Sequence, residues 1–332
     1  MTISVEWDEE AGAIVPAGTA KPKSEPSREP DPAPNPEPSS GPDPKPHVEP
    51  RARAEGRRIW LCADDYGISP AVNTAIRDLI VRGRLNATSV MVAAPSFHRS
   101  EAAPLNVLNA GAARVAIGLH LTLTAPFQPM SKDFRPLEAG AFLPLEQLLR
   151  RAALRSLNRR ALGEEIAAQV RAFVAAFGRP PHFVDGHQHV HLFPQVRDAV
   201  LAVVKEAAPR AWVRQCGSVL PLHRRLRDRK ALLLSFLSGT FRRRAARRGI
   251  ATNAAFAGTY DFTAAAAPDF AALFPTFLER LPEDSVVMCH PGRVDAELER
   301  LDPLTTQRER EYAYFSGEQF PQVLRSHGVA LA

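Results

Sequence analysis

The stretch Ile59-Trp60-Leu61-Cys62-Ala63-Asp64-Asp65 is the starting point for predicting the fold of this chain. Its five apolar residues predict a buried strand, and two adjacent carboxylates stand where that strand ends. Ser69-Pro70 follows, with a serine at the N-cap and a proline at the first helical position. These residues predict a helix that ends near Gly83. A buried strand that leads into a helix is typical of parallel α/β folds.

The same alternation continues along the chain. Polar residues gather where apolar runs stop, at Asp64-Asp65, His120, Asp185-Gly186-His187 and His290. Because α/β barrels carry their chemistry at the carboxyl ends of parallel strands, several such ends favour a barrel over an open sheet. We therefore expect an α/β fold, an irregular (β/α) barrel that is TIM-barrel-like. Further strands are predicted at 88–92, 115–121, 182–186, 211–215 and 285–289, and helices at 161–177 and 194–207.

The composition differs sharply between the start of the chain and the rest. Of the 30 prolines in 332 residues, 12 lie within residues 1–50, where acidic residues outnumber basic ones, although the whole chain carries a net charge of +6. Proline lacks an amide donor, and so polar a stretch buries little apolar surface. We predict a disordered, proline-rich tail and linker at 1–56 and a barrel domain at 57–330.

Several classes of protein are excluded at this stage. No run approaches the roughly 18 apolar residues of a transmembrane helix, and the first residues lack the basic region and apolar core of a signal peptide. Cys62, Cys216 and Cys289 are too few and too scattered for a disulfide framework. We expect a cytoplasmic protein with reduced thiols.

Asp64 and Asp65 are adjacent carboxylates at the end of a strand. At such an end the chain turns, so both side chains can face one site, where one binds a cation and the other takes a proton. The alternative is a surface turn in which an aspartate caps a helix.

Four of the ten histidines lie within residues 182–191. His187, His189 and His191 alternate, so in an extended chain they would share one face. Imidazole is the commonest metal ligand, and one aspartate with two histidines leaves positions open for water and substrate. The alternative is a set of core histidines bonded to the backbone, and not all three can be ligands.

Two further histidines stand alone. His120 lies in an apolar strand, where a single histidine is usually a core residue, whereas His290 precedes a Pro-Gly turn at the end of another apolar run. Together with the aspartates and the histidine cluster, these residues are suited to metal-assisted hydrolysis. In that chemistry a cation activates water and polarises a carbonyl while side chains transfer protons.

Four motifs occur in one order and carry a resemblance. The chain resembles the YdjC-like carbohydrate deacetylase family, of the ChbG and HpnK type, over roughly residues 57–325. The resemblance implies a (β/α) barrel and a hydrolase that removes an acetyl group from an N-acetylated amino sugar. The motifs are Ala63-Asp64-Asp65-Tyr66-Gly67, Gly118-Leu119-His120-Leu121-Thr122, Asp185-Gly186-His187-Gln188-His189-Val190-His191 and His290-Pro291-Gly292.

The resemblance also implies a role for each matching residue. Asp65, His120 and His187 match the metal ligands. Asp64 matches the general base, and His290 is the general acid that this resemblance favours. Residues expected to support the ligands or face the substrate are Asp185, His189 and His191.

One divalent metal ion is the expected cofactor. A carboxylate with two imidazoles suits zinc and other transition metals better than magnesium, but the resemblance keeps magnesium open beside zinc. Two alternatives to a deacetylase remain. A metal-dependent phosphoester hydrolase usually has two metals and more carboxylates, and a membrane-associated scaffold would keep the barrel without turnover.

An arginine-rich insertion is predicted at about 217–250. Residues 222–248 hold ten Arg or Lys and one acid, Asp228, with the apolar run 231–237 between two basic clusters. Such a segment can lie on an anionic membrane surface, which fits a lipid-linked, hopanoid- or glycolipid-related substrate as well as an oligosaccharide. The alternative is a solvated helical hairpin over the barrel. The candidate contact residues are Arg224, Arg225, Arg227, Arg242, Arg243 and Arg244.

The predicted partners follow from these features. They are an acetylated amino sugar, the inner face of an anionic membrane as a peripheral contact, and a second copy in a homodimer. No nucleic acid is expected, because the basic run has no interleaved aromatic residues and no groove-reading motif.

Overall fold

The computed structural model describes residues 56–97, 99–110, 115–217, 229–260 and 269–332. The chain divides into two units, 1–51 and 52–332, and all described residues belong to the second. The predicted disorder of the tail lies outside the described residues, as do Arg224, Arg225 and Arg227.

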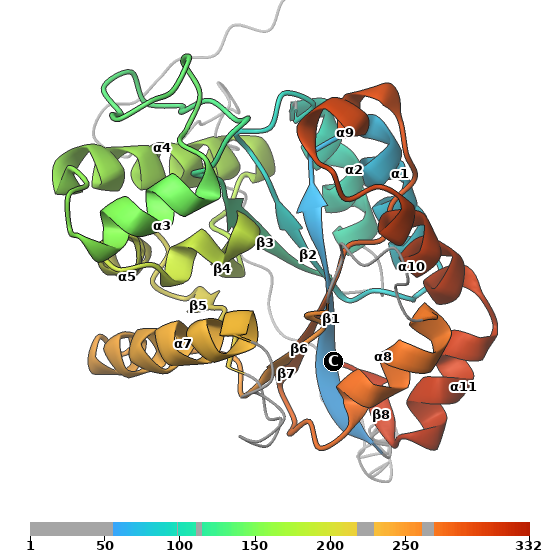
Figure 1. Ribbon diagram of the computed structural model, residues 1–332. Helices are drawn as coiled ribbons and strands as arrows, with labels where there is room; N and C mark the ends of the chain where they lie inside the picture. Colours follow the sequence, from blue (N-terminus) through green and yellow to red (C-terminus); the bar gives the residue numbers. More distant parts are fainter. Residues whose placement is uncertain (1–55, 98, 111–114, 218–228, 261–268) are drawn as a thin grey trace, which may run out of the picture. The chain divides into compact units, whose positions relative to one another are not determined.

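In the described part of the chain, eight parallel strands form one sheet, as the alternating pattern predicts (Figure 1). β1 lies near the centre, between β2 and β7, and β8 pairs with its first residues. The order along the sheet is β5-β4-β3-β2-β1-β7-β6. The strands are β1 Arg57–Tyr66, β2 Ala87–Val90, β3 Ala116–Leu121, β4 Phe183–Gly186, β5 Trp212–Val213, β6 Phe256–Ala257, β7 Ser285–Cys289 and β8 Val329–Leu331.

The two ends of this sheet approach each other. Val213 of β5 forms a parallel bridge with Thr252, just before β6, and its backbone N–H donates to the carbonyl of Ala251 at 2.9 Å. The side chain of Asn253 adds bonds to the backbone N–H and carbonyl of Gln215. The sheet therefore curls back on itself as an irregular (β/α) barrel, which confirms the predicted fold class.

Helices pack against the outside of the sheet on both sides (Figure 1). The helices are α1 Pro70–Val81, α2 Arg99–Ala110, α3 Leu145–Ala153, α4 Arg159–Phe177, α5 Val196–Ala207, α7 Arg229–Arg247, α8 Phe270–Leu278, α9 Ala296–Leu301, α10 Thr306–Ser316 and α11 Gln319–Ser326, with one 3₁₀ turn, η1 His187–Leu192. Among the described residues, no helix has both the length and the apolarity needed to cross a bilayer.

Local sequence signals account for the elements that were predicted. The hydroxyl of Ser69 accepts the backbone N–H of Val72 and caps α1, and Pro70 is the first residue of that helix. Gly118 of β3 leaves room for the ring of Phe183 from β4. A Cβ there would lie 2.4 Å from the ring of Phe183, which stacks on Trp212 instead. The glycine thus permits this aromatic stack beside the strands that carry the site.

α7 connects β5 to β6 and covers part of the predicted arginine-rich segment. It packs against α5 and η1 through one buried face at i, i+4 and i+8, formed by Leu237, Phe241 and Ala245. Arg242 and Arg243 are exposed, and Arg244 forms an ion pair with Asp198 of α5. The described half of the segment is therefore a packed helix of the barrel with a basic outer face.

Candidate metal and catalytic site

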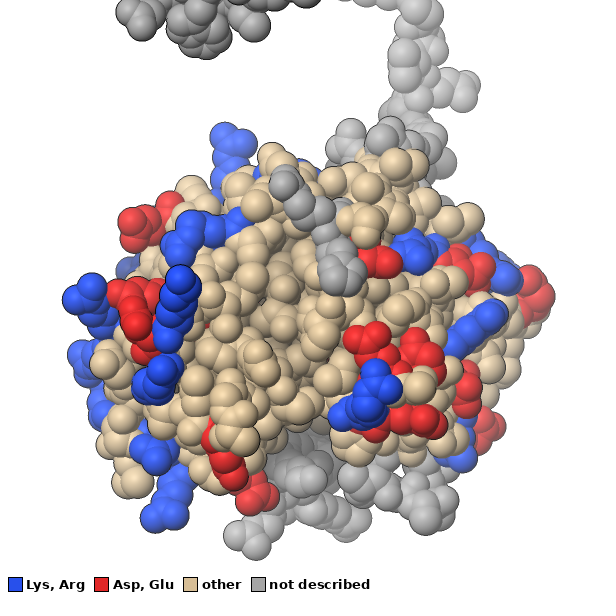
Figure 2. Space-filling view, turned by 90° about the horizontal axis from the view of Figure 1, so that it is seen from above, with Lys and Arg blue, Asp and Glu red and all other residues tan. Residues whose placement is uncertain are grey.

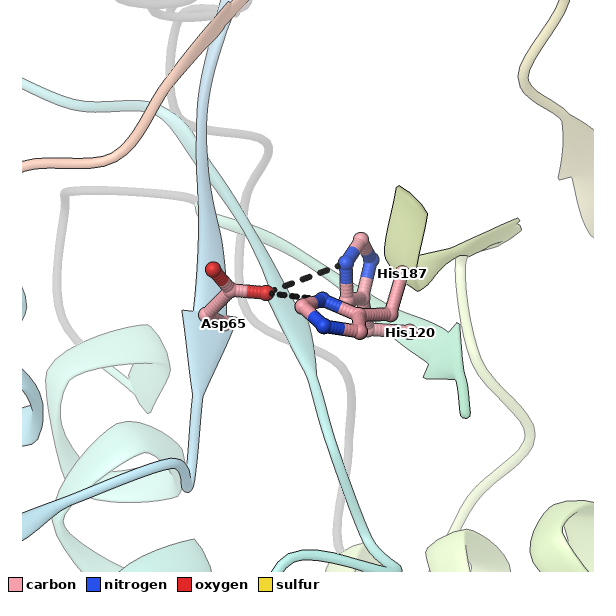
Figure 3. Close-up of side chains that lie close together, drawn as sticks. All are labelled: Asp65, His120 and His187. Atoms are coloured by element: carbon pink, nitrogen blue, oxygen red, sulfur yellow. Dashed lines mark hydrogen bonds and ion pairs between the residues drawn. The ribbon is translucent and has the colours of Figure 1, made fainter. Parts of the chain in front are cut away.

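Three side chains from distant parts of the chain meet at the carboxyl ends of β1, β3 and β4 (Figure 3). Asp65 Oδ1 lies 3.2 Å from His120 Nε2 and 3.0 Å from His187 Nδ1, and all three residues are buried. One ligand atom from each lies within 4.8 Å of those of the other two. We call Asp65, His120 and His187 the triad.

Adjacent aspartates face the same site because the strand breaks its alternation. In a regular strand Asp64 and Asp65 would point to opposite faces. Asp65 instead has a left-handed φ of 67°, and the pairing of β1 with β2 shifts register between Ala63 and Tyr66. The carbonyl of Asp65 then accepts the N–H of Ile68 in a turn. Both carboxylates are thus brought to the carboxyl end of β1.

His120 is held from behind by two polar groups. Its Nδ1 lies 2.7 Å from Asp185 Oδ1 and 3.0 Å from the hydroxyl of Ser89, which leaves Nε2 facing Asp65. Burial alone would lower the pKa of His120, but Asp185 and Asp64 outweigh it and raise this pKa to about 10. Asp185 and Ser89 thus fix the ring so that Nε2 is presented to Asp65.

Asp64 is fixed by a guanidinium that sequence reasoning missed. Arg214, fully buried just after β5, donates to both carboxylate oxygens of Asp64 at 2.6 and 2.7 Å. Burial alone would raise the pKa of Asp64, but Arg214 and His120 outweigh it and hold this pKa well below its usual range. Arg214 follows the apolar run 211–213, so a charged residue at a strand end was the available signal.

A second buried guanidinium holds the other aspartate. Arg308 of α10 donates to Asp65 Oδ2 at 2.6 Å and to Asp302 Oδ2 at 2.8 Å. Asp65 Oδ2 is therefore occupied, and Oδ1 is left to face the two histidines. The sequence gives no signal for this role, because Arg308 lies in a run of charged residues that reads as a solvated helix.

His290 lies at the edge of the triad. Its Nε2 is 4.0 Å from Asp65 Oδ2, and its backbone N–H donates to Glu311. Burial lowers the pKa of His290, although Asp65 and Asp64 oppose this effect. Burial also raises the pKa of Glu311 to about 7, and Tyr260 donates a hydrogen bond to the same carboxyl group at 2.6 Å. Glu311 was not foreseen from the sequence.

The expectation that His187, His189 and His191 share one face is wrong. The chain after Gly186 forms a 3₁₀ turn in which Gln188 and His189 are left-handed, with φ values of 52° and 58°. His191 therefore bonds the backbone carbonyl of Arg214 at 2.8 Å, and His189 lies 3.6 Å from the sulfur of Cys216. Burial lowers the pKa of His189 to about 3, so this ring is neutral. Of the three, His187 alone reaches Asp65.

A second group of close ligand atoms already surrounds a cation. Cys62, Asp64 and Asp185 also lie within 4.8 Å of one another. Arg214 Nη2 lies 2.9 Å from the Cys62 sulfur and 2.7 Å from Asp64 Oδ1, and it forms an ion pair with Asp185. The guanidinium thus fills the place that a second metal would need.

The triad fits a divalent metal ion. Ligand bonds of about 2.0–2.2 Å place neighbouring ligand atoms roughly 3.3 Å apart in a tetrahedral site. The contacts of 3.0 and 3.2 Å at Asp65 Oδ1 match that spacing. Asp185 behind His120 is the kind of support that orients metal-bound histidines. Among the described residues, the triad is one of two such groups, and the one without a guanidinium between its ligands.

The surface above the site carries few charges at its centre. Figure 2 views the molecule from the end toward which β1 points in Figure 1. Charged side chains lie mostly toward the edges of this face, with basic ones prevailing on one side and both signs mixed on the other, and the middle is largely uncharged. The carboxyl ends of the strands, where the site lies, point toward this face.

Curated proteins and a solved structure are similar to parts of this chain. A chitooligosaccharide deacetylase of Yersinia enterocolitica is 33% identical over 135 residues, which cover 40% of this chain and 50% of that protein. A chitooligosaccharide deacetylase of Yersinia pestis (strain Pestoides F) is 30% identical over 145 residues, or 43% of this chain and 54% of that protein. The chain thus matches about half the length of these curated relatives.

A solved structure shows the same fold. It is a protein of Enterococcus faecalis V583 proposed in its description to cleave cellobiose phosphate, with a TM-score of 0.63 and 21% identity, covering 83% of this chain and 97% of that one. The sequence profile described as YdjC-like protein matches residues 58–326. This chain therefore belongs to the YdjC-like protein family, as its four ordered motifs predict.

Proposed function

We propose that this protein is a metal-dependent hydrolase that removes the acetyl group from an N-acetylated amino sugar and releases acetate. The observation that carries the proposal is the convergence of Asp65, His120 and His187, with Asp64 and His290 beside them. The two matched relatives are named chitooligosaccharide deacetylases, which supports the same reaction class.

The proposed metal ligands are Asp65 Oδ1, His120 Nε2 and His187 Nδ1. When bound, a divalent ion supplies a Lewis acid that polarises a carbonyl and lowers the pKa of a bound water. Two imidazoles favour zinc over magnesium, which prefers oxygen ligands. Asp185 fixes the ring of His120, and Arg308 keeps the second oxygen of Asp65 turned away from the ligand atoms.

Asp64 is the proposed general base. Arg214 keeps it ionised, so it is ready to accept a proton from the attacking water as the carbon–oxygen bond forms. The low pKa makes Asp64 a weak base, and the reaction therefore depends on a water that is itself more acidic than bulk water.

His290 is the proposed general acid. It gives a proton to the amine nitrogen as the carbon–nitrogen bond breaks, which requires the protonated imidazole. Burial lowers the pKa of His290 and disfavours that form, while the carboxylates of Asp65 and Asp64 partly offset this effect. Glu311 holds the backbone of His290 in place through its N–H.

Acetate release is the direct test. The protein is assayed with monomeric, oligomeric and lipid-linked N-acetylated amino sugars, with added zinc or magnesium and with chelator. Acetate should appear with at least one substrate, stop with chelator and return with metal. Release of phosphate from phosphoesters without any release of acetate would favour the alternative hydrolase, and no turnover of either class would favour the scaffold.

The finer partner predictions are tested separately. Binding to anionic vesicles through Arg242 and Arg243, a homodimer and a cytoplasmic location remain predictions. Vesicle co-sedimentation of the Arg242→Gln/Arg243→Gln variant and light scattering of the purified protein address the first two.

A further inference from the structure

A pocket of about 470 Å³ lies between α4, α5 and α7, and none of its lining residues belongs to the candidate site. Four of the lining residues are arginines: Arg155 between α3 and α4, Arg159 at the start of α4, Arg244 in the last turn of α7, and Arg248 just after that helix. Gln195 and Asp198 of the α5 N-terminal turn also line it. We call this the arginine pocket.

The charges in the arginine pocket are not balanced. Asp198 is the one acidic residue that lines it among the described residues, and it pairs with Arg244 at 2.9 Å. Arg248 donates weakly to the backbone carbonyl of Arg244 at 3.4 Å. Three guanidiniums are left without a carboxylate in the described part of the chain, so the pocket carries a surplus of positive charge.

A fifth arginine adds to this surplus from within the protein. Arg197 is only 7% exposed, and its Nε has no hydrogen-bond partner among the described residues. Burial lowers the pKa of Arg197, and the nearby charges of Arg244 and Arg155 lower it further, while Asp198 acts in the opposite sense. Arg197 does not line the pocket, but its charge lies near Arg244 and Arg155 and adds to the positive field there.

Two helix N-termini border the same pocket. Arg159 is the first residue of α4, and Gln195 stands at the N-cap of α5. The positive end of a helix dipole favours anions, and this effect adds to the guanidinium charges. The side chain of Gln195 is used to bond the backbone of Leu157, so the polar groups around the pocket are held in place.

We propose that the arginine pocket binds a ligand through a phosphate or pyrophosphate group. Guanidinium forks match phosphate oxygens in pairs, and several of them around one pocket suit an anion with more than one negative charge. A single carboxylate would leave most of the surplus charge uncompensated.

The phosphate can belong to a soluble molecule or to a lipid headgroup. Two exposed apolar side chains are close in sequence to the pocket: Leu154, 69% exposed, precedes Arg155, and Phe236, 70% exposed, is two helical turns before Arg244 on α7. The experiment therefore includes both sources. The proposal is independent of the deacetylase activity, because it is tested by binding alone.

Calorimetric titration of the full chain with inorganic pyrophosphate is the first test. Saturable one-to-one binding should weaken as salt is added. The variants Arg244→Gln/Arg248→Gln and Arg155→Gln/Arg159→Gln should each weaken binding at least tenfold. Arg155 and Arg159 take no part in the ion pair with Asp198. Weaker binding by their variant is therefore not explained by a folding defect that follows from loss of that ion pair.

The matched control is Arg171→Gln/Arg210→Gln, which removes the same charge from two exposed arginines outside the pocket. It should change pyrophosphate binding less than threefold. Equal weakening by the control and the pocket variants would overturn the proposal, because it would show attraction to general basic charge. No binding of pyrophosphate, phosphate or vesicles by the wild type would also overturn it.

Co-sedimentation with phosphatidylcholine vesicles, with and without phosphatidic acid, tests the lipid source. Loss of binding to phosphatidic acid in the pocket variants but not in the control supports a lipid headgroup in the pocket. Pyrophosphate binding without vesicle binding supports a soluble phosphate compound.

Discussion

The triad region and the arginine pocket carry uncompensated charges of opposite sign. Around the triad, Asp64, Asp65, Asp185 and Asp302 share the two buried guanidiniums of Arg214 and Arg308. At the arginine pocket, Asp198 pairs with Arg244, and no described carboxylate pairs with Arg155, Arg159 or Arg248. Each arrangement leaves a surplus of one sign, buried at the triad and open to the surface at the arginine pocket, and the sign of the surplus indicates the ligand. The first region suits a cation and the second an anion.

The largest expected effect comes from removing a charge from the triad. Asp65→Asn keeps the shape of the side chain but weakens the ligand at Oδ1. We expect metal to be lost and acetate release to fall by about three orders of magnitude or more, since a metal supplies several kcal/mol of catalysis. Metal content of the purified variant and acetate assays measure both. Full metal content with full activity would remove Asp65 from the ligand set.

Asp64→Asn separates metal binding from proton transfer. The variant should keep the metal, because Asp64 contacts Arg214 and Ser89 rather than the triad ligand atoms. Turnover should fall by about 10²–10⁴-fold, the usual contribution of a general base. Single-turnover acetate release at saturating substrate measures it. A near-wild-type rate would exclude Asp64 as the base.

Arg308→Met and Arg248→Met together compare the loss of a paired arginine with the loss of an unpaired one. Arg308 is fully buried between Asp65 and Asp302, and breaking such a pair costs about 3–5 kcal/mol in the free energy of unfolding. The matched change Arg248→Met removes charge from the arginine pocket and should alter this free energy by about 0.5 kcal/mol or less. Urea unfolding of both variants measures the difference. Similar effects of the two substitutions would show that the surplus at the pocket is not a real imbalance.

The sequence predicted the fold well because the signals that define it are local. The apolar runs at 59–63 and 285–289 and the Ser69-Pro70 cap are read within a few residues, and the predicted elements are present with ends shifted by no more than three residues. The family prediction is also confirmed, since the four motifs lie within the matched range 58–326.

The site was predictable only where side chains stand at strand ends. Asp65, His120 and His187 meet as expected, but the left-handed backbone at Gln188 and His189 that separates the three alternating histidines has no sequence signal. Arg308 and Glu311 reach the site from α10, whose charged sequence looks like that of a solvated helix. Their roles depend on tertiary packing that a local pattern does not record.

Glu311 gives the smallest expected effect and a pH dependence with a definite sign. Burial raises its pKa from an ordinary 4.5 to about 7. The folded protein therefore holds this proton more tightly than the unfolded chain, and the associated stability is full below pH 4.5 and is lost as the pH rises through 7. The loss is at most about 3.5 kcal/mol, at about 1.4 kcal/mol for each pH unit between 4.5 and 7.

Glu311→Gln should remove this dependence, because the amide resembles the protonated carboxyl group that accepts the N–H of His290. The free energy of unfolding of the variant, minus that of the wild type, should be larger at pH 8 than at pH 4. Urea unfolding of both proteins at both pH values measures this difference. Glu309→Gln, an exposed glutamate on the same helix, is the matched control and should behave as the wild type does. If the stability of the Glu311→Gln variant falls between pH 4 and pH 8 as steeply as that of the wild type, then Glu311 is ionised at neutral pH. In that case the ionised carboxylate of Glu311 adds one negative charge to the region around His290. This region would then attract a cation more strongly.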